Sequence, residues 1–533
     1  MRQTVLPVCD SPVPDILSFN TESFSVPQTN PSDVFDVLRS LNPWKAPGVD
    51  DIPPLLLREC ARSISPSLSA LYNLSFAKGR VPAEWKKALV IPVFKSGNKA
   101  LPTNYRPISL LCIISKVQER LVFNKLYHFL GPILSSRQSG FRKNDGTEFQ
   151  LLRLVQSWSE ALDSSHYVGA VFFDLKKAFD KVWHPGLLSK LAASRVSGSA
   201  LALVSDFLSE RSQRTVVGTS ISDELSPFAG VPQGAILSPL LFLVYVNDLP
   251  AAISQGEANL FADDTSVYVS HKDPCCLEQH LQAAVDEVQL WMTKWLVAVN
   301  PLKSAVMVFR TSRMDYHPVC ITINGETIKQ TTCHRHLGLQ LDESLSWSPH
   351  VDYVCKKLSQ RIGLLHRFRR QLSSPIIWNI YVATTMPVAD YACVVLGPGI
   401  KKSDCEKLER VHRCAARLIS GTRLADHVSH ELLLARAGLS ALSAHRLHRL
   451  AWFAYKLSSG FVPDHLLTST KHWLTPPPER SRTLRNTAVF RLPMPKKAVL
   501  FRSPVYADLS LWNSLPNSLR FSSRSQLKQH FLS

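Results

Sequence analysis

The chain has 533 residues, of which 45% are hydrophobic and 19% are charged. This length and balance predict a folded protein with roughly two to four structural units and an ample core. The longest apolar run, residues 235–246, is too short to span a bilayer, and the polar N-terminus lacks the apolar segment of a secretory signal, so no membrane partner is expected. The 11 cysteines include no C-x-x-C pair, which indicates a reducing compartment and argues against a structural zinc site.

The net charge of +19 is distributed unevenly. Residues 1–350 carry 33 Lys and Arg against 32 Asp and Glu, a balance of +1, whereas residues 351–533 carry 28 against 10, a balance of +18. An excess of this size in one part of the chain predicts a surface that binds a polyanion. The alternative is a basic, solvated surface without a partner.

The chain opens with a polar segment rich in proline, residues 1–32, which predicts a linker. A helix is expected from Pro31 onward, with Ser32 or Asp33 near its N-cap, because Ser and Asp side chains accept hydrogen bonds from the first N–H groups of a helix.

Two strands are expected next. Residues 82–97 predict a strand that runs into a Ser-Gly turn. Pro107 biases Arg106 toward an extended conformation, so Lys95 and Arg106 are expected to face each other from adjacent strands. Taken alone, either residue could be an ordinary surface cation.

A third β-type segment, residues 167–173, is apolar and ends in Asp174. An aromatic residue, Phe179, follows five residues later and could be an ordinary core residue. Residues 230–234, Gly-Val-Pro-Gln-Gly, predict a turn before an apolar helix, which by itself is a weak signal.

Two acids, Asp263 and Asp264, lie between two short apolar runs that predict a hairpin with the acids at its tip. Alternation of apolar and polar residues over 265–270 predicts that this hairpin belongs to a half-buried sheet. Together with Asp174 at a strand end, the pair predicts a three-carboxylate site for two Mg²⁺ ions, with Mn²⁺ as a possible substitute. The alternative for an isolated Asp-Asp pair is turn chemistry.

The basic part of the chain contains apolar residues at helical spacing, while its cations fall largely on other faces. The first such helix has Val351, Val354, Leu358, Ile362 and Leu365 on its apolar face, with Lys357, Arg361, Arg367 and Arg370 elsewhere. The same design returns at Leu408, Val411, Ala415 and Leu418. A further linker is expected around residues 476–478.

Three motifs resemble those of reverse transcriptases. They are Phe-Phe-Asp-Leu-Lys-Lys-Ala-Phe-Asp-Lys-Val-Trp-His at 172–184, Gly-Val-Pro-Gln-Gly-Ala-Ile-Leu-Ser-Pro at 230–239 and Phe-Ala-Asp-Asp at 261–264. They are most similar to the motifs of non-LTR (LINE-type) retrotransposons, within these the jockey-like and chicken-repeat-like elements. The resemblance extends from about residue 33 to the C-terminus.

The resemblance implies roles for residues that the pattern alone left open. Lys95 and Arg106 would grip the incoming triphosphate, as the planar fork of Arg suits phosphate oxygens. Phe179 would pack under the sugar and exclude a 2′-hydroxyl. Gln233 would contact the nascent base pair, and Gly234 would permit close backbone approach.

Two later segments resemble further motifs of the family. Lys303, in Asn-Pro-Leu-Lys-Ser, would protonate the pyrophosphate leaving group, although it could also be a solvent-exposed lysine. Residues 336–342 resemble the primer grip, but His336 stands where relatives usually have an aromatic residue.

The resemblance also implies the architecture: an α+β, right-hand polymerase with a basic, mainly helical C-terminal extension. The expected boundaries are a linker at 1–32, fingers and palm at 33–345, a thumb-like helical region at 346–425 and the extension at 426–533.

The expected function is RNA-directed DNA synthesis with an RNA template, a DNA primer and deoxynucleoside triphosphates, in the nucleus and cytoplasm. Residues 1–32 have no room for the endonuclease domain of full-length relatives, so a nicking endonuclease would be supplied elsewhere. The alternative is a decayed or domesticated copy that binds RNA without catalysis.

Overall fold

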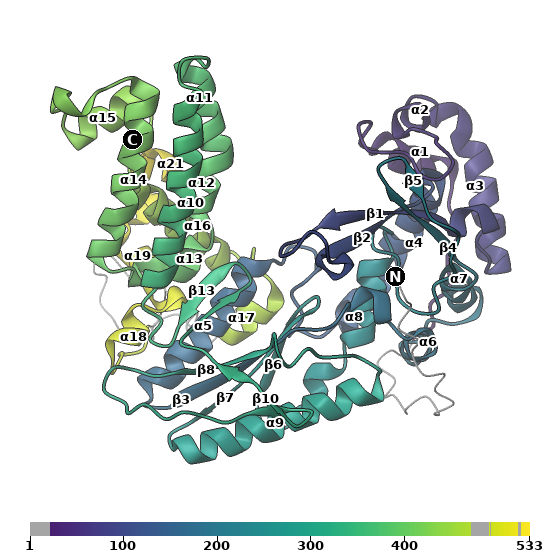
Figure 1. Ribbon diagram of the computed structural model, residues 1–533, viewed down its shortest axis with the longest axis horizontal. Helices are drawn as coiled ribbons and strands as arrows, with labels where there is room; N and C mark the ends of the chain where they lie inside the picture. Colours follow the sequence, from purple (N-terminus) through teal and green to yellow (C-terminus); the bar gives the residue numbers. More distant parts are fainter. Residues whose placement is uncertain (1–21, 471–489, 491, 521–523, 533) are drawn as a thin grey trace. The chain divides into compact units, whose positions relative to one another are not determined.

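The computed structural model describes residues 22–470, 490, 492–520 and 524–532, which combine helices with four sheets (Figure 1). The expectation of an α+β protein is therefore confirmed. Two compact units interleave along the chain: unit 1 comprises Met1–Phe141, Asp174–Ala252 and Glu287–Asn300, and unit 2 comprises Arg142–Phe173, Ile253–Asp286 and Pro301–Ser533. Most of the predicted linker, residues 1–21, and the proline stretch at 476–478 lie outside the described residues.

Unit 1 contains a four-stranded sheet in the order β2-β1-β4-β5, in which β1 pairs antiparallel with β2 and parallel with β4. Its strands are β1 (Lys87–Phe94), β2 (Tyr105–Leu110), β4 (Ser212–Val217) and β5 (Ser220–Ile221). Its helices are α1 (Pro31–Arg39), α2 (Pro54–Glu59), α3 (Ala61–Lys78), α4 (Ile113–Leu130), α6 (His184–Ala193), α7 (Gly198–Leu208) and α8 (Ser238–Val246), with 3₁₀ turns η1 (Ala83–Lys86), η2 (Pro102–Asn104), η3 (Gly131–Ile133), η4 (Phe179–Lys181) and η5 (Leu249–Ala252).

The helix predicted from Pro31 is α1, and Asp33 lies near its N-cap as expected, although the N-cap residue itself is not Ser32 or Asp33. Asn30 is the N-cap: its side chain accepts the Asp33 N–H at 2.9 Å, and the Asp33 carboxylate accepts the Asn30 N–H at 3.1 Å. Pro31 occupies the first helical position, where its fixed φ suits the helix and its missing N–H costs nothing. The cap therefore lies one residue before the proline.

Unit 2 is built on a five-stranded sheet in the order β11-β8-β3-β7-β6. The central strand β3 pairs antiparallel with β7 and with β8, β6 pairs antiparallel with β7, and β11 pairs parallel with β8. The strands of unit 2 are β3 (Tyr167–Phe173), β6 (Glu257–Phe261), β7 (Asp264–His271), β8 (Ala305–Phe309), β9 (Thr322–Ile323), β10 (Glu326–Thr327), β11 (Lys329–Gln330), β12 (Cys333–His336) and β13 (Leu339–Asp342).

The sheet of unit 2 is covered on both faces, so the prediction that the hairpin belongs to a half-buried sheet was wrong. On one face, Trp158 of α5 (Thr147–Asp163) stacks on Phe309 with ring centroids 4.5 Å apart. On the other, α9 (Pro274–Lys294) approaches β3 so closely that a Cβ on Gly169 would lie 2.8 Å from the Leu281 side chain. Thr265–Val269 of β7 are accordingly all buried, polar residues included.

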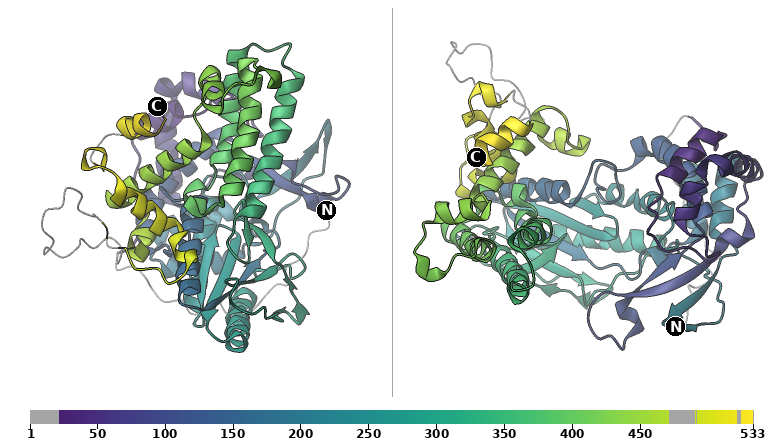
Figure 2. Two further views of the ribbon diagram at one scale, coloured as in Figure 1. Left: turned by 90° about the vertical axis from the view of Figure 1, so that its left-hand side faces the viewer. Right: turned by 90° about the horizontal axis from the view of Figure 1, so that it is seen from above.

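The remaining helices of unit 2 share one hydrophobic core with α5 and the sheet. They are α10 (Ser348–Arg367), α11 (Ser374–Ile380), α12 (Met386–Asp390), α13 (Cys393–Leu396), α14 (Lys402–Ser420), α15 (His430–Ala437), α16 (Leu442–Ser458), α17 (Asp464–Thr470), α18 (Ala498–Phe501), α19 (Pro504–Ser514), α20 (Asn517–Arg520) and α21 (Arg524–Leu532), with short turns η6 (Tyr381–Thr385), η7 (Gly397–Gly399) and η8 (Leu424–Asp426). The views of Figures 1 and 2 agree that α10 and α14 lie side by side.

The apolar stripe predicted on α10 is confirmed, because Val351, Val354, Leu358, Ile362 and Leu365 are all buried. Lys357, Arg361, Arg367 and Arg370 are exposed, as their positions outside the stripe predicted.

One helical stretch among the described residues, Ser374–Leu396, is long and apolar enough to cross a membrane by length and composition alone. Ile377, Tyr381 and Met386 of this stretch are buried in the core of unit 2. Packing inside a folded unit therefore accounts for its apolar composition.

Candidate active site

The predicted acidic hairpin is formed by β6 and β7 in unit 2. Phe261 pairs with Asp264, which leaves Ala262 and Asp263 as a two-residue turn. Ala262 has a φ of 55°, a left-handed conformation of the kind that two-residue hairpin turns require. Asp263 and Asp264 are exposed, while the next residue, Thr265, is buried. The two carboxylates therefore stand at the boundary between the sheet and solvent.

The strand β3 ends beside this hairpin, because Phe173, its last residue, is in register with Thr265. Asp174 follows Phe173 directly in the chain and belongs to unit 1. There the segment after β3 pairs with residues 298–300: the Asp174 carbonyl accepts the Asn300 N–H at 2.8 Å, and the Lys176 N–H donates to the Ala298 carbonyl at 2.7 Å.

The donor chemistry of the hairpin tip fits a divalent cation, because adjacent carboxylates offer the hard oxygen ligands that Mg²⁺ prefers. Among the residues that the structure describes, no three His, Cys, Asp or Glu side chains gather into a metal site. Mg²⁺ usually keeps several waters and binds through one or two carboxylates with substrate phosphates. Asp263 and Asp264 would therefore supply part of the ligand set of such an ion.

Phe179 begins the turn η4 in unit 1 and is half-buried. Its ring stacks on Phe242 of α8, with centroids 4.5 Å apart and planes 18° apart, and meets the edge of Phe141 at 6.0 Å. Its carbonyl accepts the Val231 N–H at 2.8 Å. These contacts fix one side of the ring and leave part of it open.

The loop that contains Gln233 and Gly234 is fixed on two sides. The Gln233 amide donates to the Asp180 carboxylate at 2.8 Å, and the Ser109 N–H of β2 donates to the Gln233 carbonyl at 2.6 Å. Gly234 has a φ of 130°, and a Cβ there would lie 2.5 Å from the Ser109 carbonyl oxygen. The backbone of Gly234 therefore lies close to that of β2, and its role at a nascent base pair stays a prediction.

The predicted phosphate cations, Lys95 and Arg106, lie on neighbouring strand ends, as expected, and both are exposed. Arg106 is in register with Val93, whereas the Lys95 N–H, just beyond β1, donates to the Asn104 carbonyl at 2.9 Å. The two residues are therefore diagonal neighbours rather than a directly opposed pair.

Lys303 is exposed in the turn before β8. His336 ends β12 and is buried, with its ring centroid 4.9 Å from that of Phe172. Burial lowers the pKa of His336 to about 3, so its ring is neutral and packs as an aromatic residue would. Thus the departure from the family pattern at this position keeps an aromatic contact.

The reverse transcriptase family, described as "Reverse transcriptase (RNA-dependent DNA polymerase)", matches residues 93–341. Over 403 residues the chain is 31% identical to the RNA-directed DNA polymerase from mobile element jockey of Drosophila melanogaster, a match that covers 73% of this chain and 43% of that relative. It is 29% identical to the probable RNA-directed DNA polymerase from transposon BS of the same species, with 73% of this chain and 44% of the relative covered.

The chain carries a reverse transcriptase domain. This domain is homologous to those of non-LTR retrotransposons, as the motifs predicted. The chain spans less than half the length of the curated relatives it matches. All predicted site residues, from Lys95 to Lys303, fall within the reverse transcriptase domain, and their roles stay predictions.

The structure adds three residues that support the domain's Gln233 loop and that sequence reasoning missed. Buried Glu119 of α4 accepts the Ile236 and Leu237 N–H groups at 2.7 and 3.1 Å, and burial raises its pKa although these bonds oppose the shift. His184 donates through Nε2 to the Gly230 carbonyl at 2.7 Å.

Asp180 is the third, and burial raises the pKa of its carboxyl against the opposing hydrogen bond from Gln233 and the charge of Lys177. The sequence signal for Glu119 was weak: it is the one acid of α4, but Gln118 and Arg120 flank it directly, as in a solvated stretch.

Proposed function

We propose that this chain is an RNA-directed DNA polymerase that copies retrotransposon RNA into DNA. The observation that carries the proposal is the match of residues 93–341 to the reverse transcriptase family, with Asp263 and Asp264 at an exposed hairpin tip. The substrates are an RNA template, a DNA primer and deoxynucleoside triphosphates.

Asp174, Asp263 and Asp264 hold two Mg²⁺ ions in this proposal. The register of β3 and β7 supports this part of the proposal, because Phe173 pairs with Thr265. Asp174 follows Phe173 in the chain, and Asp264 precedes Thr265. Bound in pairs, such ions lower the pKa of an attacking hydroxyl and neutralise charge on a transferring phosphoryl group. The carboxylates orient these ions and supply the negative charge that retains them.

The other predicted residues act on the nucleotide. Lys95 and Arg106 bind triphosphate oxygens, and their exposure leaves both side chains accessible to a ligand. Phe179 excludes a 2′-hydroxyl with the open part of its ring, and Gln233 and Gly234 form the surface under the nascent base pair. Lys303 protonates the leaving pyrophosphate.

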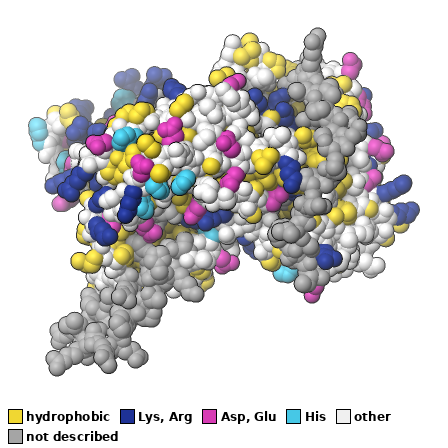
Figure 3. Space-filling view, turned by 90° about the horizontal axis from the view of Figure 1, so that it is seen from below, with side chains coloured by type: hydrophobic (Ala, Val, Ile, Leu, Met, Phe, Trp, Pro, Cys, Tyr) yellow, Lys and Arg dark blue, Asp and Glu magenta, His cyan; other side chains and the backbone are white. Residues whose placement is uncertain are grey.

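The right-hand architecture also belongs to this proposal. The four-stranded sheet and helices of unit 1 correspond to fingers, the five-stranded sheet of unit 2 to the palm, and α10 with α14 to the thumb. The exposed cations of α10 bind the phosphates of the primer–template duplex, while the residues that follow form the basic extension. Where its residues are described, the face in Figure 3 mixes basic, acidic and apolar side chains.

Primer extension tests the proposal. The purified chain should extend a DNA primer on an RNA template only when Mg²⁺ or Mn²⁺ is present. The substitution Asp263→Ala should lower the extension rate at least about a hundredfold, because a ligand of the reacting ions is lost. The control Glu326→Ala removes an exposed acid from β10 of the same unit and should extend normally. Near-wild-type synthesis by Asp263→Ala would disprove the mechanism.

A further inference from the structure

A pocket in the helical part of unit 2 has no role in the proposed polymerase reaction. It has a volume of about 340 Å³ and is lined by residues from the end of α14, the following loop and α15. Figure 1 shows α15 at the end of the helices that is remote from β6 and β7, the hairpin of Asp263 and Asp264. We propose that this pocket binds one unpaired nucleotide of a single-stranded nucleic acid.

The loop that forms the pocket is held by its own hydrogen bonds. Gly421, with a φ of 73°, caps the C-terminus of α14, and α15 begins after Ser429, whose hydroxyl accepts the Leu432 N–H at 3.3 Å. Between them, the Asp426 carboxylate accepts the Arg423 backbone N–H at 2.6 Å. His427 has a φ of 46°, a conformation that is uncommon for a residue other than glycine. The loop therefore presents its side chains from a defined backbone.

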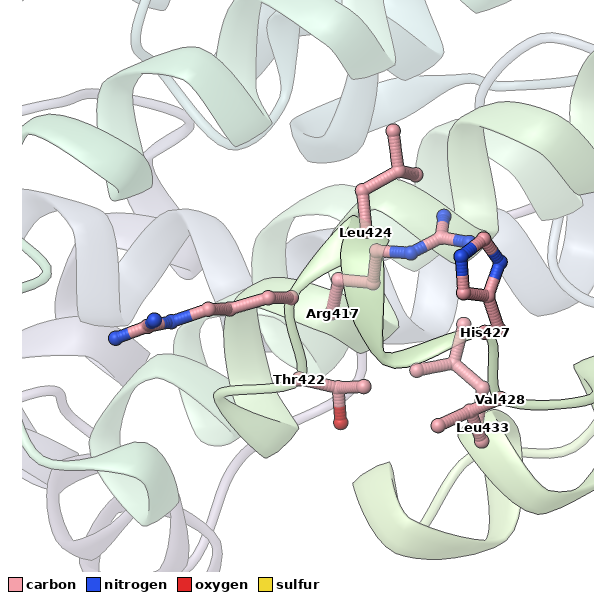
Figure 4. A pocket seen from close by; sticks show the side chains of 7 residues that line it. Arg417, Thr422, Leu424, His427, Val428 and Leu433 are labelled. Atoms are coloured by element: carbon pink, nitrogen blue, oxygen red, sulfur yellow. The ribbon is translucent and has the colours of Figure 1, made fainter.

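Cationic side chains form one part of the pocket. Arg417 and Arg423 line it together with His427, and the side chain of Arg417 runs toward the His427 ring (Figure 4). Within the described part of the chain, neither arginine has an ion-pair partner within 4.0 Å. Asp426, the one acid among residues 421–429, is bound to backbone. An anion is thus the ligand that this charge would recognise, and the planar guanidinium groups suit phosphate oxygens.

Apolar side chains form another part of the pocket, and an inorganic phosphate would make no favourable contact with them. Leu424 is 76% exposed and Val428 is partly exposed, while Leu433 belongs to the core beneath them (Figure 4). A ligand that covers Leu424 and Val428 must carry a flat or apolar group next to its anionic group. A nucleotide has both, and bases commonly stack on apolar, aromatic or guanidinium surfaces.

The size and shape of the pocket favour an unpaired nucleotide over a duplex. Pockets of about 300–1,000 Å³ hold small ligands, and one base with its phosphate is at the lower end of that range. A base inside a duplex is stacked and paired, so it cannot enter a pocket unless it is first extruded at a cost of a few kcal/mol. A single strand presents its bases without that cost. The ligand is therefore an unpaired nucleotide in a looped or single-stranded RNA segment away from the reacting primer end.

Binding of the full-length chain to two labelled probes tests the inference. The probes are a short, fluorescein-labelled single-stranded oligoribonucleotide and the RNA–DNA duplex of the same sequence, each titrated by fluorescence anisotropy. The double variant Arg417→Ala/Arg423→Ala should lower the affinity for the single strand about tenfold, while its affinity for the duplex should change much less. The variant Leu424→Ala removes no charge and should lower single-strand affinity about threefold or more.

A matched control is Lys402→Ala/Arg410→Ala, which removes the same charge from exposed positions of α14 outside the pocket. It should leave single-strand affinity close to that of the wild type. Equal losses for the control and the pocket variant, or an unchanged affinity for Leu424→Ala, would overturn the inference. So would pocket-dependent binding of a free nucleoside monophosphate together with pocket-independent binding of the single strand.

Primer extension measured on the same preparations separates this inference from the proposed function. Wild-type protein that does not extend a primer would count against the polymerase and leave the binding comparison valid. Pocket variants that bind the single strand as the wild type does, in a chain that extends normally, would refute the pocket alone.

Discussion

Phe179 illustrates how a single side chain combines packing with a proposed role in substrate selection. Its ring is stacked on Phe242 on one side and is half-buried overall. We expect Phe179→Ala to raise the incorporation of ribonucleotides relative to deoxynucleotides about tenfold or more, because the steric barrier to a 2′-hydroxyl is removed. Single-nucleotide extension with each substrate measures this ratio.

The control is Phe228→Ala, which removes a phenylalanine of unit 1 that is 79% exposed. It should leave the ratio unchanged. If Phe179→Ala lowers the melting temperature but the two substrates keep their wild-type ratio, Phe179 is a core residue and nothing more.

Gly234 is constrained by both conformation and space. A Cβ at this position would meet the Ser109 carbonyl at 2.5 Å, and its φ of 130° is unfavourable for any other residue. Gly234→Ala should therefore destabilise the fold by about 1–3 kcal/mol and displace the Gln233 loop. The melting temperature should fall, and the KM for deoxynucleotides should change.

Gly131→Ala is the comparison, since its Cβ would meet nothing within 4 Å and its φ is −49°. It should be neutral or slightly stabilising. If Gly234→Ala keeps the melting temperature and the KM of the wild type, the loop accommodates a side chain without displacement.

At the scale of elements, α5 joins the sheet of unit 2 to the C-terminal helices. The Asp163 carboxylate accepts the Lys496 and Lys497 N–H groups at 3.1 and 2.5 Å, and the Gln156 side chain accepts the Val505 N–H of α19 at 3.1 Å. Asp508 of α19 is fully buried, and neither of its oxygens has a hydrogen-bond partner within the described residues. Burial, and secondarily the charge of Glu148, raises the pKa of Asp508 well above 3.8.

This raised pKa predicts a pH-dependent effect of Asp508→Asn. Between pH 4 and the folded pKa, the unfolded state loses the Asp508 proton while the folded state keeps it, so rising pH favours unfolding. Asn cannot ionise and removes this penalty. The melting temperature of Asp508→Asn relative to wild type should be nearly unchanged at acidic pH and higher at pH 8.

Asp315→Asn, at an exposed position of unit 2, should show no such trend. A difference between Asp508→Asn and wild type that stays constant from pH 4 to pH 8 would show that Asp508 is already ionised in the folded chain.

At the scale of the whole molecule, the described helices after residue 350 belong to the same compact unit and core as the five-stranded sheet. A truncation near residue 343 would strip α5 of its packing partners, so surface substitutions are the better test of charge. We change Lys357, Arg367 and Arg370 to Gln and measure RNA–DNA duplex binding against salt concentration. The slope of log affinity against log salt should become shallower by up to about 2–3, because fewer counterions are released when fewer phosphates are neutralised.

The matched control changes three exposed cations on or beside α3 of unit 1, Arg62, Lys78 and Arg80, to Gln. It removes the same charge and should leave the slope nearly unchanged. Equal slopes in all three proteins would mean that α10 carries a solvated basic face.

Local signals predicted much of the fold and the candidate site. The hairpin at Asp263 and Asp264 and the strand before Asp174 were predicted correctly, since each follows from a run of β-forming residues with a turn or a charge at its end. The N-cap at Asn30 could have been read from the same local rules, because the proline after it marks the first helical position.

The sequence alone determined the presence of a reverse transcriptase domain, the apolar face of α10 and the concentration of positive charge after residue 350, because these depend on residue identity and short-range spacing. Tertiary structure decided the burial of β7 on both faces, the supporting contacts of Glu119 and Asp180, and the pocket beside Arg417. Each of these joins residues from separate elements. Local spacing does not encode which distant segments cover a strand or share a hydrogen bond, and that choice is made only when the whole chain packs its core.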